Sequence, residues 1–156
     1  MTFNFLYADI EASGRLLEKY VLNDWVHALN PVTASTLRGG LLSNCNVRFL
    51  FITNIGKDFG IEDGDYKQQG LYIFPSHLYY QVLDKWHIGN KAQILLTPHS
   101  YPSDLVVNSI IRAAREDFRE LHSAEPVTVL DNAEWKARTA VQPGFNGKNA
   151  PHKQGR

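Results

Sequence analysis

The sequence has 156 residues, of which 44% are hydrophobic and 21% are charged. This length and composition are typical of one globular domain and exclude global disorder. No apolar run reaches the roughly 18 residues that span a bilayer, and residues 1–10 lack the basic leader and cleavage site of a secretory signal, so we expect a cytoplasmic protein without a membrane segment. Cys45 is the only cysteine, which excludes an intramolecular disulfide.

The 16 basic and 16 acidic side chains balance, but they are unevenly distributed. From Lys136 onward there are five cations and no acid, so residues 1–135 hold the other 11 cations and all 16 acids. Residues 142–156 are rich in Gly, Pro, Asn and Lys, which predicts a flexible, disordered basic tail after a globular domain of residues 1–141. Two roles for the tail stay open: a solvated terminus, or a basic arm in weak contact with nucleic acid or an acidic partner.

The N-terminal segment predicts a strand followed by helices. Residues 2–10 alternate between aromatic and polar side chains, as a strand does. Residues 13–29 carry apolar side chains near helical spacing after Ser13, a plausible N-cap, although residues 20–29 could instead hold a strand. Residues 30–38 begin with Asn-Pro and are followed by Gly39-Gly40, which predicts a short helix closed by glycine.

The densest apolar material lies in the middle of the chain. Val47–Thr53 is a continuous apolar run, which predicts a strand buried on both faces at the centre of a sheet. Residues 56–70 form a predicted loop. Leu71–Phe74 predicts a strand that stops at Pro75, residues 76–86 predict an aromatic-rich helix, and Lys91–Thr97 predicts another strand.

The C-terminal part contains the strongest helix pattern. After Ser103, apolar side chains follow a single stripe to Leu121, with charged side chains on the other side. Residues 126–130 predict a final strand, and residues 131–137 predict a short helix. Together these elements predict an α+β fold: a single mixed sheet of about five strands with helices packed against it and at least one antiparallel pair.

The usual catalytic and metal-binding signatures are absent from the sequence. It contains no Gly-rich phosphate loop and no HExxH, CxxC or GxSxG motif. The four acids of residues 58–65 lack the ligand order of a calcium loop. The six histidines have no metal-ligand spacing, although His77 and His87 could meet in space. We therefore expect no metal site.

One ordered set of motifs resembles the ADP-ribosyltransferase superfamily. His27 is followed by the segment ending in Gly40-Leu41, then by the glycine-aromatic segment Gly70–Phe74, then by a segment that carries Tyr79-Tyr80. Members of this family place a histidine at the end of a strand, then a short helix ending in Gly-Leu, then a glycine-aromatic strand and a helix with another aromatic. The resemblance covers residues 27–97.

The resemblance implies an enzyme that uses NAD and transfers ADP-ribose to a protein or nucleic acid. His27 would hydrogen-bond a ribose of NAD, and Tyr72, or Tyr80 nearby, would stack on the nicotinamide. A later carboxylate, Glu125 or Glu134, would stabilise the oxocarbenium-like centre as nicotinamide leaves. The implied catalytic residues are therefore His27, Tyr72, Glu125 and Glu134, and the cofactor-binding residues are His27, Tyr72 and Tyr80.

Three alternatives stay open beside the enzyme. The tyrosines could simply pack in the core or on the surface. The protein could be a small non-catalytic interaction or inhibitor module that binds a protein partner through Tyr79, Tyr80 and Trp86. Exposed aromatics and the basic tail could also hold single-stranded nucleic acid, although the sequence pI near 7.0 weakens that hypothesis.

Overall fold

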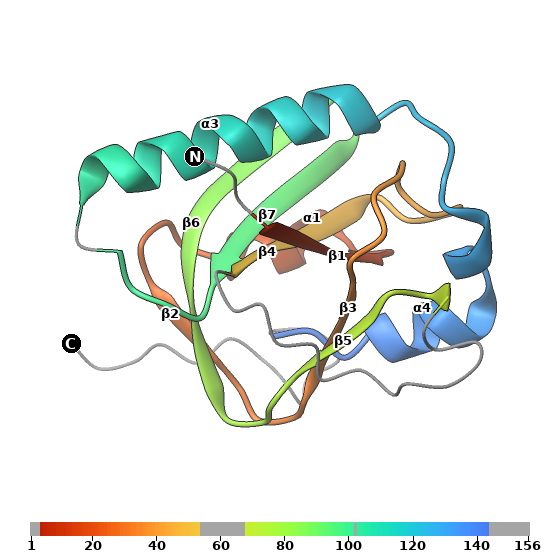
Figure 1. Cartoon of the computed structure of the whole chain (residues 1–156), viewed down its shortest axis with the longest axis horizontal. Coiled ribbons are helices and arrows are strands. Elements are labelled where there is room, and N and C mark those ends of the chain that lie inside the picture. The colour runs from red at the N-terminus through yellow and green to blue at the C-terminus, as the bar shows by residue number, and fades with distance from the viewer. Residues whose placement is uncertain (1–3, 54–67, 102, 144–156) are drawn as a thin grey trace.

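The computed structural model describes residues 4–53, 68–101 and 103–143. At its centre is one seven-stranded sheet with the order β2-β6-β7-β4-β1-β3-β5. The strands are β1 (Asn4–Ile10), β2 (Trp25–Ala28), β3 (Val32–Ser35), β4 (Val47–Thr53), β5 (Leu71–Phe74), β6 (Leu78–Ile88) and β7 (Lys91–Thr97). The described helices are α1 (Gly14–Glu18), α3 (Asp104–Leu121), α4 (Ala133–Thr139) and the 3-10 helix η1 (Thr128–Leu130) (Figure 1).

The most apolar segment of the sequence forms the middle strand, as predicted. β4 runs parallel to β7 and antiparallel to β1. Its Phe49 and Phe51 pack into the core on one face of the sheet, whereas Leu50 and Ile52 pack on the other. A strand that is buried on both faces needs apolar side chains at successive positions, which explains the continuous run.

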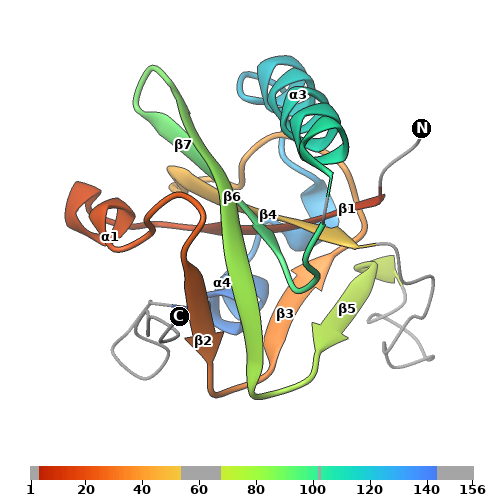
Figure 2. The same ribbon diagram turned by 90° about the vertical axis from the view of Figure 1, so that its left-hand side faces the viewer.

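Both ends of the sheet contribute to one core. Val26 and Ala28 of β2 belong to the same buried cluster as Val32 of β3 and Phe74 of β5, although β2 and β5 are the two ends of the strand order. Figure 2 shows β2 and β5 on either side of β6, with the β2–β3 and β5–β6 connections close together at the bottom of the view. The sheet therefore curves around this cluster, which we call the inner core.

Helix α3 covers the opposite face of the sheet, and the predicted apolar stripe is the contact surface. Ile110, Ala114 and Leu121 pack against a second cluster that includes Leu50 and Leu95. Ser103 is the N-cap residue, but its side chain makes no capping hydrogen bond. The predicted helix is confirmed, and its burial on the sheet rather than its cap accounts for its position.

Two segments that were predicted to be helices are strands. Residues 76–86 form most of β6, which pairs with β2 on one side and β7 on the other. Its Tyr80 and Val82 point into the inner core, whereas Tyr79 and Gln81 are only half-buried. Residues 30–38 contain β3, paired with β1 and β5. Aromatic and β-branched side chains pack well on a sheet, and two-sided pairing overrides the helical spacing.

Other boundaries also differ from the prediction. The helix predicted over residues 13–29 is limited to α1, and β2 occupies the end of that range, which is the alternative left open. The strand predicted at residues 126–130 is wrong: this segment holds η1 and a single bridge from Pro126 to Gly40. The sheet has seven strands rather than about five because β2, β3 and β6 join it and this last strand does not.

Some predictions lie outside the described residues. Most of the acidic loop at residues 56–70 and nearly all of the tail at residues 142–156 belong to this group. Gln142 is described, is fully buried and donates a hydrogen bond from Nε2 to the Thr33 carbonyl at 3.0 Å. The division into a domain and a tail stays a prediction. Among the described helices, none combines the length and the apolar character that a bilayer crossing requires.

Candidate functional site

His27 lies on a strand and points away from the inner core. Its neighbours Val26 and Ala28 are buried in that core, and successive side chains of a strand point to opposite faces. His27 is paired with Tyr79 across β2 and β6, and the two rings stack with centroids 4.3 Å apart at 13°. The His77 ring is 6.0 Å from the His27 ring. These side chains form a half-exposed cluster that we call the His27 cluster.

Tyr72 and Tyr80 lie on the other side of the sheet from His27. They are 4% and 0% exposed, and both belong to the inner core. The Phe74 ring lies between them, at 5.0 Å from the Tyr72 ring and 5.7 Å from the Tyr80 ring. Burial raises the pKa of the Tyr80 phenol, with a smaller contribution from Tyr72. Neither ring is open to solvent in this arrangement.

The two predicted carboxylates lie on separate segments. Glu125 is exposed in the connection after α3, where its backbone carbonyl accepts a hydrogen bond from the Gly40 amide at 2.9 Å. Glu134 is exposed on α4 and pairs with Arg138 at 2.6 Å. Arg138 in turn donates to the Gln69 side chain, just before β5. Glu134 is thus linked to the β5 end of the sheet, and Glu125 to the segment that contains Gly40.

Tyr79 is the aromatic residue that lies beside His27, and the resemblance did not select it. The available signal was the strand pairing, because Tyr79 is opposite His27 whereas Tyr80 is opposite Val26. His77 is a second residue of the His27 cluster that the resemblance did not select. It has φ +67°, and its amide donates a hydrogen bond to the Ala28 carbonyl at 2.9 Å. A positive φ at a non-glycine residue is uncommon, and here it turns the chain from β5 into β6.

Trp86 is directed towards α3 rather than towards Tyr79. The guanidinium carbons of Arg115 and Arg119 lie 5.0 and 5.2 Å from the centroid of its ring, and the Phe118 ring is 6.5 Å away. Arg115 is also held by Asp84 through two hydrogen bonds of 2.8 and 2.9 Å. Tyr79, Tyr80 and Trp86 therefore do not form one continuous aromatic surface.

A groove lies on another part of the molecule, between the turn before β4 and helix α4. A hollow of about 330 Å³ is lined by residues that include Glu11, Cys45 and Lys136. A second hollow of about 360 Å³ shares Glu11 and Cys45 with it and extends to Asn90. Volumes of this size are within the range of small-molecule sites. We call these two adjoining hollows the Cys45 groove.

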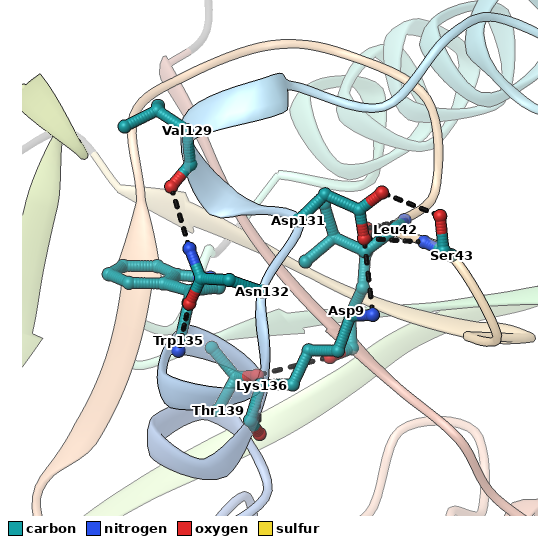
Figure 3. Close-up of polar contacts among 9 residues, drawn as sticks. All are labelled: Asp9, Leu42, Ser43, Val129, Asp131, Asn132, Trp135, Lys136 and Thr139. Carbon is teal, nitrogen blue, oxygen red and sulfur yellow. Dashed lines mark hydrogen bonds and ion pairs between the residues drawn. The ribbon is translucent and has the colours of Figure 1, made fainter.

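Hydrogen bonds and an ion pair fix one end of the Cys45 groove (Figure 3). The Asp131 carboxylate accepts from the Ser43 hydroxyl at 2.5 Å and from the Ser43 amide at 2.9 Å. Lys136 pairs with the same carboxylate at 3.1 Å. The hydrogen bond from the Ser43 side chain is the largest contribution that lowers the pKa of Asp131. Asp131 is therefore engaged by groups of the protein itself.

A buried ion pair lies behind the groove. Asp9 and Arg48 are 4% and 2% exposed and are joined by two hydrogen bonds of 2.8 and 3.0 Å. Asp9 also accepts from the Leu42 amide at 3.1 Å, and the Arg48 guanidinium lies 4.8 Å from the centroid of the Tyr7 ring. Burial is the largest single influence on the pKa of Arg48 and acts to lower it, but the charges and hydrogen bonds of its neighbours, Asp9 first among them, raise this pKa overall. No group of His, Cys, Asp or Glu in the described part of the chain could hold a metal ion.

Comparisons with known proteins give three solved structures that are similar to this chain at low sequence identity. No family model and no curated protein matches the sequence. Among solved structures, the ADP-ribosyltransferase HopU1 of Pseudomonas syringae is similar with a TM-score of 0.48 and 10% identity, over 62% of this chain and 44% of that one. Exoenzyme S from Pseudomonas aeruginosa, solved with human 14-3-3 protein beta and carba-NAD, is similar with a TM-score of 0.47 and 10% identity, over 70% of this chain and 57% of that one.

A third similar structure is the Vis toxin, an ADP-ribosyltransferase from Vibrio splendidus, with a TM-score of 0.43 and 16% identity over 62% of this chain and 48% of that one. The chain thus spans about half the length of these three proteins. All three TM-scores are below 0.5, so these structures do not assign a function to this chain.

Proposed function

We propose that this protein is an ADP-ribosyltransferase-like enzyme that binds NAD at the His27 cluster and transfers ADP-ribose to a protein or nucleic acid. The observation that supports it is the half-exposed stack of His27 on Tyr79. In the resemblance, the histidine is at the end of a strand and a glycine-aromatic strand follows. His27 is the penultimate residue of β2, and β5 follows Gly70 directly.

The residues fit NAD unequally. His27 can offer a ring nitrogen to a ribose hydroxyl, and the Tyr79 face can stack on a planar ring. Tyr72 and Tyr80 do not fit the nicotinamide-stacking role while they are buried, so we assign that role to Tyr79. Glu125 and Glu134 remain the proposed carboxylates that stabilise positive charge as nicotinamide leaves. The cytoplasmic location stays a prediction.

Substituting His27 with alanine, or Tyr79 with leucine, is expected to weaken NAD binding. Loss of one aromatic stacking partner is worth about 1–3 kcal/mol, or roughly 5- to 150-fold in Kd. Titration of NAD while following tryptophan fluorescence and the melting temperature measures the effect. His87→Ala is the matched control, because His87 is exposed near the far end of β6. The proposal fails if millimolar NAD gives no response or if all three variants bind alike.

The rate at which nicotinamide is released from NAD measures the chemical step separately from NAD binding. If either Glu125 or Glu134 stabilises the reacting centre, its change to glutamine should lower the rate about 10²- to 10³-fold and leave the Kd of NAD unchanged. Equal rates for both variants and the unaltered protein would remove these two glutamates from the mechanism.

A protein-binding role is the second candidate, and one feature of the surface favours it. Three exposed apolar side chains flank β2, namely Val21, Leu22 and Leu29. Together with Tyr79 they would give a partner an apolar contact area beside the His27 cluster. Leu22→Ser with Leu29→Ser should then abolish capture of a partner from a lysate, whereas Leu105→Ser, an exposed leucine on α3, should not. Capture that is insensitive to all three changes would contradict this role.

A further inference from the structure

The Cys45 groove is lined by both acidic and basic side chains, namely Asp9, Glu11 and Lys136. Asp9 and Glu11 line the first hollow, and Asp131 is bonded to Ser43, which lines it too. Asp9 is neutralised by Arg48, and Asp131 is shared between Ser43 and Lys136. Glu11 is exposed, and no hydrogen bond or ion pair involves its carboxylate within the described residues. One negative charge therefore remains in the middle of the groove, where the two hollows join.

The pKa of the Cys45 thiol is affected by the same charged side chains. Burial is the main reason that the pKa of Cys45 is raised to about 12. Asp9, Asp131 and Glu11 raise it further, and only Lys136 acts in the opposite direction. A pKa raised by neighbouring charges means that the potential at the sulfur is negative. A raised pKa disfavours the thiolate, the form of cysteine that acts as a nucleophile.

The lining of the groove indicates which kind of cation fits. Ile10, Cys45 and Ala140 give the first hollow an apolar lining, whereas Asn44 and Asn90 place amide groups along the second. A divalent metal ion requires several oxygen ligands, and only Glu11 offers an uncommitted carboxylate. An organic cation requires a single counter-charge and apolar walls for its carbon chain. The groove matches the second description.

We propose that the Cys45 groove binds an alkylammonium group, with Glu11 as the counter-ion and the apolar lining in contact with the alkyl chain. The group is either a free amine or the lysine side chain of a bound polypeptide, since the two share this chemistry. The site is separate from the His27 cluster and does not depend on NAD.

Titration of the full chain with n-butylammonium chloride tests the site, with amide chemical shifts of Asn44, Cys45 and Asn46 as the readout. We expect saturable shifts that n-butanol, the uncharged analogue, does not reproduce. Glu11→Gln should weaken binding roughly two- to fivefold, in line with an exposed ion pair. Glu18→Gln is the matched control, because Glu18 is exposed on α1 outside the groove and its loss should change nothing.

A capped Gly-Lys-Gly peptide distinguishes the two sources of the cation. Tighter binding of the peptide than of n-butylammonium supports a polypeptide ligand, and equal binding supports a free amine. The proposal is overturned if n-butanol binds as tightly as n-butylammonium, if Glu11→Gln binds as the unaltered protein does, or if no saturable shift occurs. An unchanged melting temperature in the Glu11→Gln variant confirms that any loss of binding is not a loss of fold.

Discussion

Replacing Asp9 with alanine is expected to lower the free energy of unfolding by about 3–5 kcal/mol, because it leaves the buried Arg48 guanidinium without its counter-charge. Arg48 is 2% exposed, and both of its hydrogen bonds to a side chain go to Asp9. The Leu42 amide loses its acceptor as well. Urea denaturation followed by circular dichroism measures the change.

Two further variants separate the buried charge from other effects. The double change Asp9→Leu with Arg48→Met should be less destabilising than Asp9→Ala, because no unpaired charge is then buried. Glu116→Ala removes an exposed partner of Arg119 and should cost less than about 1 kcal/mol. If Asp9→Ala is as mild as Glu116→Ala, the ion pair does not have the stabilising role assigned to it.

Replacing Trp135 with alanine should lower the free energy of unfolding by about 3–5 kcal/mol, as expected for removing a large buried aromatic side chain. Trp135 is almost fully buried and packs with Leu42, Leu71 and Leu130 in a third cluster between α4 and the sheet. Chemical denaturation measures the loss, and the native fluorescence should also lose its most blue-shifted component, since Trp135 is the most buried of the three tryptophans.

Trp86→Ala is the matched control for this experiment. Trp86 is half-buried and contacts arginine side chains of α3, so its removal should be clearly milder than that of Trp135. A loss of less than about 1 kcal/mol for Trp135→Ala would mean that α4 does not depend on this side chain and that the cluster can close around the cavity.

The parts of the fold that were predictable are those with one dominant local signal. The continuous apolar run of β4 and the single apolar stripe of α3 each match only one kind of element. β6 carries two signals, because its aromatic residues are compatible with helical spacing and with strand alternation. Pairing with β2 and β7 decides between them, and those partners are far away in the sequence.

The candidate site was predictable only in part for the same reason. Motif order selected His27, and the structure places it on a strand, half-buried beside another ring. Whether Tyr79 or Tyr80 accompanies His27 depends on which face each tyrosine takes, and that follows from pairing rather than from composition. The Cys45 groove is formed by the end of β1, the turn before β4 and helix α4. Because these segments are far apart in the sequence, no short motif could predict the groove.

The turn at His77 has a consequence for how sequence variation can act on this protein. Its amide bonds to the Ala28 carbonyl at the point where β6 begins to pair with β2, and so fixes which residues of the two strands are opposite each other. Slippage of β2 by one position would exchange the faces of His27 and Val26, moving the imidazole inward and a valine outward. An insertion that shifted β2 by one residue in this register would therefore invert the surface of β2, whereas a substitution that keeps the register would leave it unchanged.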